Sequence, residues 1–378
     1  MKFRALAVLA LASSLSGCFL WSSNPGPLPS PLPAFQPSAS LREQWHGGMG
    51  SIEASMLRPA LAGGSLYAAS RSGRLARFDA TGRELWSVKT AARLSGGVGS
   101  DSSVVVVASS DGELLAHDAD KGSLRWKVAI EGEVLASPLV TGDLVVVRVG
   151  DNLLAAYGLA DGKRRWIYQR AQSPLALRNY SGLLVVGDLL VAGFPGGRLV
   201  AVSLSGGVQR WESTIAQPKG SNELERMTDV VGTPVLRGDA VCVAAFQGRV
   251  ACVDRDSGVM RWSRDFSSAV GVDADATALY VTDASDSVYS LDAGSGSTNW
   301  KQDKLLYRKL GRPLIVGNSL AVADEEGYVH VLSRQDGHFI ARLRADSSGI
   351  SAPLLLLPNN ALAVQARDGS LYAFAVPQ

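Results

Sequence analysis

The side chain best placed for a covalent reaction in this sequence is the thiol of Cys18. It directly follows Leu-Ser-Gly at positions 15–17, an order typical of a bacterial lipobox, in which the cysteine is acylated and becomes the mature N-terminus. Two basic residues precede an apolar run over residues 5–15, which is too short to span a bilayer. We therefore expect a signal peptide over residues 1–17 and lipidation of Cys18, rather than an ordinary cleavage site with an unrelated cysteine.

A lipid anchor at Cys18 would hold the chain at a membrane surface. Each buried methylene contributes about 0.8 kcal/mol, and several acyl chains exceed the two signals that stable anchoring requires. Residue 19 is Phe rather than the Asp that retains many enteric-type lipoproteins at the inner membrane. The expected location is therefore the periplasmic face of the outer membrane.

The other reactive side chains show no arrangement typical of catalysis or metal binding. The histidines lack metal-ligand spacing and are His46, His117, His330 and His338. Cys242 and Cys252 lie on two expected strands joined by a turn at 247–248, so they could face each other across a hairpin. They could form a disulfide, which the periplasm permits, or be two small buried apolar residues. We expect no catalytic residue, no metal site and no cofactor.

Composition limits the classes of partner. The chain has 378 residues, of which 46% are hydrophobic, and a net charge of only +2. It can therefore bury a large core, and it lacks the basic excess typical of nucleic-acid binding. Proteins or small molecules are the expected partners.

The elements that carry these residues are set by a tryptophan repeat. Tryptophan returns at intervals of 38 to 51 residues, at positions 45, 86, 126, 166, 211, 262 and 300. The last six follow a glycine by four residues, at Gly82, Gly122, Gly162, Gly207, Gly258 and Gly296. This period is that of one four-stranded blade following another around a propeller. Alternating apolar runs broken by turn residues predict strands throughout.

Counting outer strands closes the ring at eight blades. Six blades carry a tryptophan, and Gly337 followed by Ala341 marks a seventh in which the tryptophan is replaced. The last segment, 351–376, lacks an outer strand, while 41–45 stands alone before the first full blade. Pairing the two removes open sheet edges. The predicted fold is all-β: an eight-bladed β-propeller of four-stranded antiparallel blades over residues 41–378, closed by an N-terminal strand that completes the last blade.

A tether over residues 18–40 is expected between the lipid and the propeller. It contains six prolines among serines, at positions 25, 27, 29, 31, 33 and 37. This composition favours extended polyproline geometry over packed structure. At about 3.1 Å per residue, the tether could reach roughly 60 Å from the membrane.

The repeated units resemble the pyrroloquinoline-quinone type of propeller repeat. The shared pattern is an apolar run, a turn glycine, an aspartate, a second glycine and the tryptophan, with the aspartates at Asp79, Asp118, Asp254 and Asp292. Within that superfamily, the lipobox, short tether and eight-blade body resemble the BamB family, lipoproteins of the outer-membrane β-barrel assembly machinery. The similarity covers essentially the whole chain. The repeat is shared with enzymes, so by itself it indicates fold rather than function.

Two insertions distinguish this chain from a regular repeat. The intervals 166–211 and 211–262 are the longest, and their extra residues fall between an outer strand and the next inner strand, so we expect them to be neighbours on one face. The first carries Leu175, Leu177 and Arg178, and the second carries Glu223, Glu225, Arg226 and Asp229. Leucines beside an arginine have the composition of an interface hot spot, and the acids could orient that arginine or meet a basic partner. The alternative is that both are solvated loops.

The family resemblance assigns a role to the same insertions. Leu-Ala-Leu-Arg at 175–178 resembles the segment with which the BamB family docks on the periplasmic domains of the barrel-forming protein BamA. Asp229 lines up with the first residue of an acidic pair at that surface, whereas Val231 stands at the second position. The resemblance thus implies partner binding through Leu175, Leu177, Arg178 and Asp229.

Two other classes of protein compete with this interpretation. A quinone-dependent dehydrogenase shares the repeat but needs bound calcium, a catalytic aspartate and, in many members, adjacent bonded cysteines. No adjacent cysteines occur, and most acids belong to turns. A cell-wall polysaccharide binder would need exposed loop aromatics, for which Tyr180 and Tyr307 are the candidates. We therefore expect a non-enzymatic scaffold that binds a BamA-like barrel-insertion protein and could receive unfolded outer-membrane protein clients by strand addition.

Overall fold

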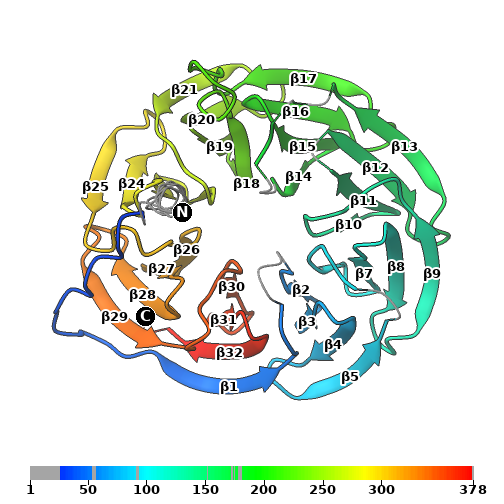
Figure 1. Cartoon of the computed structure of the whole chain (residues 1–378), viewed down its shortest axis with the longest axis horizontal. Coiled ribbons are helices and arrows are strands. Elements are labelled where there is room, and N and C mark those ends of the chain that lie inside the picture. Colours follow the sequence, from blue (N-terminus) through cyan, green and yellow to red (C-terminus); the bar gives the residue numbers. More distant parts are fainter. Residues whose placement is uncertain are drawn as a thin grey trace, which may run out of the picture.

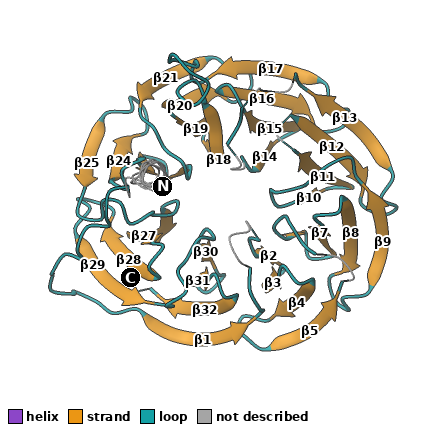
Figure 2. Ribbon diagram, in the orientation of Figure 1, coloured by secondary structure: helices purple, strands orange, loops and turns teal. Residues whose placement is uncertain are grey.

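Eight sheets of four strands surround a central channel (Figure 1). The computed structural model describes residues 26–376, except for 53–56, 91–92, 151, 172, 174 and 178–180. In this part of the chain, the regular secondary structure consists of antiparallel strands (Figure 2). The same residues contain no helix with the length and apolar character needed to cross a membrane. The predicted eight-bladed propeller is confirmed.

The strands of each blade follow one another from the channel outward. Blade 1 contains β2 (Ala60–Ala62), β3 (Ser65–Ala69), β4 (Arg74–Phe78) and β5 (Glu84–Lys89), and blade 2 contains β6 (Gly99–Ser100), β7 (Val104–Ala108), β8 (Glu113–Asp118) and β9 (Leu124–Ala129). Blade 3 contains β10 (Leu139–Thr141), β11 (Leu144–Val149), β12 (Leu153–Gly158) and β13 (Arg164–Gln169), and blade 4 contains β14 (Leu183–Val186), β15 (Leu189–Phe194), β16 (Arg198–Ser203) and β17 (Gln209–Thr214).

The second half of the ring repeats this arrangement. Blade 5 contains β18 (Asp229–Arg237), β19 (Ala240–Phe246), β20 (Arg249–Asp254) and β21 (Met260–Asp265), and blade 6 contains β22 (Val272–Ala274), β23 (Ala278–Thr282), β24 (Val288–Asp292) and β25 (Thr298–Gln302). Blade 7 contains β26 (Leu314–Val316), β27 (Ser319–Ala323), β28 (Tyr328–Ser333) and β29 (Phe339–Arg344). Blade 8 contains β30 (Leu355–Leu356), β31 (Ala361–Gln365), β32 (Ser370–Ala375) and, as its outer strand, β1 (Arg42–Gly48).

Strand β1 closes the ring as the sequence predicts. It pairs antiparallel with β32, and Trp45 lies opposite Ala373 after a register shift that begins at Glu43. The last blade is therefore built from both ends of the propeller, and its outer β32 edge is covered. Closure of this kind removes the exposed strand edge that invites aggregation.

Position within a blade determines the strand sequence. The second strand of blade 2, β7, reads Val-Val-Val-Val-Ala and is buried throughout, because blades cover both of its faces. The outer strand β9 instead alternates exposed and partly buried residues, since one side faces solvent. Continuous apolar runs and alternating runs therefore mark the middle and the rim of each blade.

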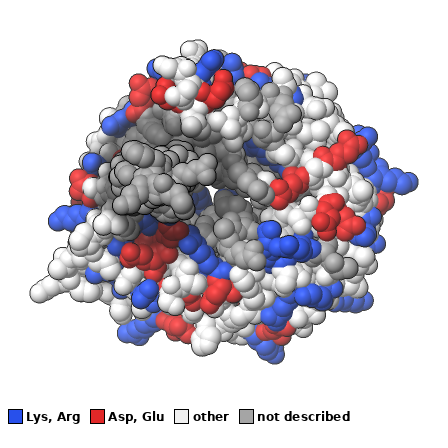
Figure 3. Space-filling view, in the orientation of Figure 1, with Lys and Arg blue, Asp and Glu red and all other residues white. Residues whose placement is uncertain are grey.

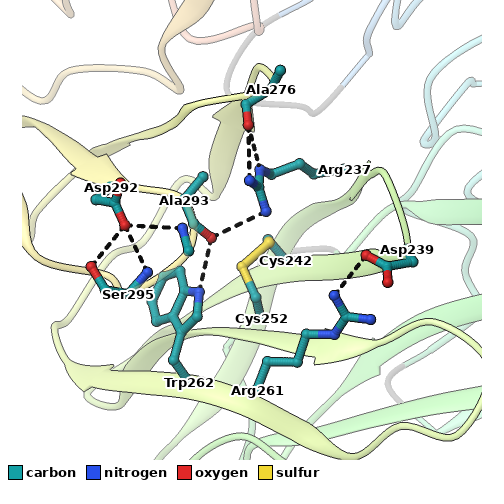
Figure 4. Close-up of a disulfide and its surroundings, with 11 residues drawn as sticks. Arg237, Asp239, Cys242, Cys252, Arg261, Trp262, Ala276, Asp292, Ala293 and Ser295 are labelled. Atoms are coloured by element: carbon teal, nitrogen blue, oxygen red, sulfur yellow. Dashed lines mark hydrogen bonds and ion pairs between the residues drawn. A yellow bond between two sulfur atoms is a disulfide. The ribbon is translucent and has the colours of Figure 1, made fainter.

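Each repeated tryptophan joins its own blade to the next. The ring nitrogen donates to a backbone carbonyl of the following blade, at 2.8 to 3.2 Å, in the pairs Trp45–Ala80, Trp86–Ala119, Trp126–Leu159, Trp166–Leu204, Trp211–Arg255, Trp262–Ala293 and Trp300–Arg334. Figure 4 shows the Trp262 contact at 3.0 Å. We call this the tryptophan–glycine contact, because the repeat glycine of the following blade lies against the indole ring. A Cβ on that glycine would lie less than 3 Å from ring atoms.

The repeat aspartates shape the turns that present these carbonyls. Asp292 accepts hydrogen bonds from the backbone N–H groups of Gly294 and Ser295, at 3.1 and 2.8 Å. Figure 4 shows its contacts with Ser295. The hydrogen bond from the Ser295 hydroxyl is the main reason why the pKa of Asp292 lies below its ordinary value. Asp79, Asp118 and Asp254 accept equivalent backbone bonds in their own turns. These carboxylates are structural.

The interface between blades 7 and 8 differs from the other seven. Ala341 occupies the tryptophan position in β29, and Leu41 occupies the glycine position four residues before Trp45. Leu41 packs instead against the hydrophobic cluster shared by these two blades. Apolar packing therefore replaces the tryptophan–glycine contact where the two ends of the propeller meet.

Residues 30–38, which we call the strap, lie on blade 7. Ser30 donates through its N–H to the Leu306 carbonyl at 2.9 Å, and the Phe35 ring stacks on Phe339 with centroids 5.3 Å apart. Ser38 donates to the carbonyl of Ile340 at 3.1 Å. Figure 1 shows this blue segment following the outside of β29. The expected tether is thus fixed to the propeller over its second half, and its free reach is shorter than the sequence suggested.

Two arginines of blade 7 hold the strap. Arg308 donates to the Ser30 carbonyl at 2.9 Å, and Arg342 donates to the Pro33 carbonyl at 3.0 Å. Arg308 is buried and is itself positioned by an ion pair with Asp324 at 2.7 Å. The attachment therefore uses a prearranged cation rather than a flexible surface side chain.

The two cysteines whose state the sequence left open form a disulfide. Cys242 of β19 and Cys252 of β20 are directly opposed in register, with Cα atoms 4.1 Å apart. Both residues are buried in blade 5, beside Trp262 (Figure 4). The bond connects the two middle strands of the blade that follows the second insertion.

The tryptophan–glycine contact predicts a difference between two glycines with the same backbone conformation. Gly207 (φ 65°) and Gly187 (φ 62°) both have positive φ, but a Cβ would lie 2.5 Å from the Trp166 ring at Gly207 and in open space at Gly187. Gly207→Ala should lower the free energy of unfolding by about 1–3 kcal/mol more than Gly187→Ala, because only the former overpacks the interface. Urea unfolding of both variants measures this. Equal losses would show that the ring contact is not limiting.

The strap contacts predict a local effect of Phe35→Ala. Loss of the ring that stacks on Phe339 should speed hydrogen exchange at the Ser38 amide and increase proteolysis within the strap, because it removes an apolar contact between the strap and blade 7. Leu28→Ala is the matched control, since Leu28 lies just before the strap and is 81% exposed. Unchanged exchange at Ser38 in Phe35→Ala would show that the stacking does not hold the strap.

Candidate functional site

The two insertions form neighbouring connectors on one face of the ring. The first connector, residues 170–182, joins β13 to β14, and the second connector, residues 215–228, joins β17 to β18. Both enter the innermost strands of adjacent blades, as expected. Gly182 at the end of the first connector donates to the carbonyl of Gly232 in β18 at 3.0 Å. The connectors are therefore bonded to a common element.

Asp229 ties the first connector to blade 5. Its carboxylate accepts the backbone N–H of Leu177 at 2.5 Å and that of Gly196 at 3.3 Å. The residue is only 4% exposed and opens β18, where it also bridges to Pro195. A carboxylate in this position orients the connector backbone through charge-assisted hydrogen bonds. Asp229 thus lies beneath the candidate surface rather than on it.

The other predicted site residues differ in their exposure to solvent, and some of them lie outside the described residues. Leu175 is 37% exposed and Leu177 is partly buried. Arg178 and Cys18 lie outside the described residues, as does Tyr180. Val231, at the second acidic position of the resemblance, is buried in β18 opposite Ala244 and offers no surface to a partner. The structure therefore brings Leu175, Leu177 and Asp229 together, with only Leu175 well exposed.

The second connector is a self-supporting turn. The Glu225 carboxylate accepts the Ser221 N–H at 2.7 Å and the Asn222 amide at 2.9 Å, while the Asn222 carbonyl oxygen of the side chain accepts the Glu225 N–H at 2.9 Å. The Gln247 amide, which sits on the β19–β20 turn, faces the carbonyls of Leu224, Glu225 and Met227. Blade 5 therefore contacts this turn through the Gln247 side chain.

This turn presents an apolar side chain that the sequence interpretation missed. Leu224 is 67% exposed, more than Leu175. Its neighbours Glu223 and Arg226 are also exposed, and acidic and basic side chains are interspersed around the ring in Figure 3. The sequence did contain a signal for the exposure of Leu224. Asn222 and Glu225 have the spacing of a side-chain cap, which predicts a turn at the surface. The surface thus combines two exposed leucines with charges of both signs.

The histidines and Tyr307 lie in separate local settings. His46 and His338 pair with Glu43 and Asp336 at 2.7 and 2.6 Å on the exposed rim. His330 is buried, and desolvation lowers its pKa although it contacts Asp324 at 3.1 Å. Tyr307 is 39% exposed between blades 6 and 7. No group of three or more His, Cys, Asp or Glu side chains suited to a metal occurs among the described residues.

These observations define a propeller of pyrroloquinoline-quinone-type repeats. It differs from a regular array of such repeats at its two long connectors. A family model described as "Outer membrane protein assembly factor BamB" matches residues 71–302. A protein of that name from Bordetella pertussis is 38% identical over 98% of this chain and 96% of its own length. The chain belongs to the BamB family.

Solved structures separate the family from its fold relatives. BamB from Moraxella catarrhalis matches with a TM-score of 0.82 and 26% identity, covering 89% of this chain and all of that chain. The quinohemoprotein alcohol dehydrogenase of Comamonas testosteroni matches with a TM-score of 0.69 and 12% identity over 89% of this chain and 78% of that one, which shows the fold alone. The family is named for protein assembly, and the chain is a non-enzymatic propeller.

The role of Asp229 predicts the effect of Asp229→Asn. The amide keeps the size of the side chain but loses the charge that strengthens the bond from Leu177, so stability should fall by about 1–3 kcal/mol and the Leu177 amide should exchange faster. Asp256→Asn, at a carboxylate on the exposed rim, is the control. Hydrogen exchange followed by mass spectrometry distinguishes the two variants. Wild-type protection at Leu177 in Asp229→Asn would remove Asp229 from this role.

Proposed function

We propose that this protein is a lipid-anchored scaffold that supports the assembly of outer-membrane β-barrel proteins. Its relatives are named outer membrane protein assembly factors, and the similarity extends over nearly the whole chain. The observation that carries the proposal is the pair of connectors, which are fixed to each other through β18 and present Leu175 and Leu224 to solvent. Exposed apolar side chains are suited to protein binding rather than to catalysis.

The proposed partner is the periplasmic part of a BamA-like barrel-insertion protein. Leu175 and Leu224 would supply apolar contact, and Arg178, adjacent to Leu177, would supply a charge-assisted anchor. Asp229 would act as a positioning residue, since it is buried and holds the Leu177 backbone. The acidic rim residue Glu223 would favour a partner with basic side chains nearby.

The proposed location is the periplasmic face of the outer membrane. Residues 1–17 would be a signal peptide, Cys18 would carry the lipid, and residues 18–40 would link it to the propeller at 41–378. The support is the residue order around Cys18 together with the name of the family. Acyl chains of this kind give stable anchoring because their methylenes add about 0.8 kcal/mol each.

Unfolded barrel clients could bind at the rim of the ring. The outer strands carry exposed apolar side chains, namely Leu85 on β5, Leu124 on β9 and Ile167 on β13. Each of these strands also has one edge without a neighbour in its sheet. An extended client could therefore add as a fifth strand while its side chains contact this apolar row.

A pull-down from membranes tests the docking surface. Leu175→Asp and Arg178→Glu should each reduce recovery of the barrel-insertion partner about tenfold or more, since central interface residues typically contribute more than 1 kcal/mol. Val208→Asp is the matched control, because Val208 is 61% exposed in the turn between β16 and β17, outside both connectors. Circular dichroism confirms that each variant is folded. Wild-type recovery with both connector variants would place the docking surface elsewhere.

A further inference from the structure

The central channel holds a cavity at the end where the connectors enter. The cavity has a volume of about 330 Å³ and is lined by residues that precede or begin innermost strands, including Arg58, Pro138, Gly182 and Pro353. Figure 3 shows the ring hollowed at its centre. Because Gly182 ends the first connector, the cavity borders the candidate docking surface.

The cavity is lined by a cation, Arg58, for which the described residues supply no counter-charge. Among the described residues, the guanidinium of Arg58 has no hydrogen bond or ion pair, and the charged group that acts on it is Arg312, which has the same sign. Burial, together with Arg312, lowers the pKa of Arg58 to about 10. The group is still protonated at neutral pH, so a positive charge is held in a recess where its field is poorly screened.

Every other buried or half-buried arginine among the described residues has a hydrogen-bond or ion-pair partner, which for Arg237, Arg264 and Arg342 is a backbone carbonyl. Arg77, Arg170 and Arg308 contact carboxylates of Asp120, Glu212 and Asp324 at 2.8, 2.6 and 2.7 Å. An interior charge without a partner is costly, which is why such pairing is the rule. Arg58 departs from a pattern that the same chain follows elsewhere.

Arg312 is only partly neutralised. Its Nη1 donates to the Val272 carbonyl at 3.1 Å and lies 3.6 Å from the Asp273 carboxylate, which also accepts the Ile315 N–H. Two arginines, Arg58 and Arg312, therefore line one recess that contains no carboxylate among its described lining residues. The arrangement is suited to an anion between them.

We propose that this cavity binds a carboxylate that carries a small apolar group, with Arg58 as its charge partner. A planar guanidinium matches the two oxygens of a carboxylate. The remaining walls are mostly apolar, and leucines at 135, 139 and 354 would enclose the substituent. The volume is at the lower end of the range for small-ligand sites.

Two sources could supply such a group: a free small carboxylic acid, or the terminal carboxylate of a polypeptide held at this face. They share the same recognition chemistry. This inference does not rest on the barrel-assembly partner, since the cavity is present in the chain itself. The pull-down and a ligand titration can therefore fail independently.

Isothermal titration calorimetry of the full mature chain tests the site with defined probes. These are hexanoate and an acetylated alanyl-leucyl-leucine peptide with either a free or an amidated C-terminus. At least one free carboxylate should bind with one-to-one stoichiometry, and Arg58→Gln should weaken that binding by on the order of tenfold or more. Binding of hexanoate would identify a small acid as sufficient, whereas binding of the free peptide alone would identify a chain terminus.

The stability of the variants, measured without ligand, provides a second readout that is independent of the binding titration. In the absence of ligand, Arg58→Gln should raise the melting temperature, because it removes a charge repelled by Arg312, whereas Arg308→Gln should lower it by breaking a buried pair. Arg58→Lys keeps the charge without the planar fork and should bind with intermediate affinity. Failure of both free carboxylates to bind, equal binding of the amidated peptide, or destabilisation by Arg58→Gln would overturn the proposal.

Discussion

The structure depends on the contact between an indole ring and a glycine of the next blade. The ring can reach its carbonyl acceptor only where the neighbour has no Cβ, so each interface accepts one relative position of two sheets. Seven such contacts fix the angular order of the blades. The connectors of blades 4 and 5 come together because this constraint is repeated around the ring.

Most of the fold could be predicted because the residues that pack one blade on the next recur at nearly regular intervals in the sequence. Tryptophan and glycine spacing gave the blade count, and the incomplete last repeat predicted the pairing of β1 with β32. The strap was not predicted, because proline-rich composition indicates extended backbone but does not reveal that Phe35 will find Phe339. Local composition cannot report a contact made three hundred residues away.

The candidate site was predictable in position but not in detail. Insertion length placed the two connectors side by side, yet the sequence could not show that Asp229 is buried while Leu224 is exposed. Asp229 opens β18 and is covered by the first connector, whereas Leu224 lies in the turn that precedes this strand. The sequence could not single out Arg58 for a related reason: whether a charge has a partner among the described residues is known only from their positions in space. The function proposed for this protein uses the places where one repeat departs from the others.

The strap also determines how an anchored ring would be suspended. With Cys18 acylated as proposed, about a dozen residues separate the lipid from Ser30, a span of roughly 40 Å at full extension. The pivot lies at the rim, near blades 6 and 7, instead of on the ring axis. Tilting about this eccentric pivot would move the connectors, two blades away, along an arc. Such a hinge restricts the directions from which a membrane-embedded partner can approach them.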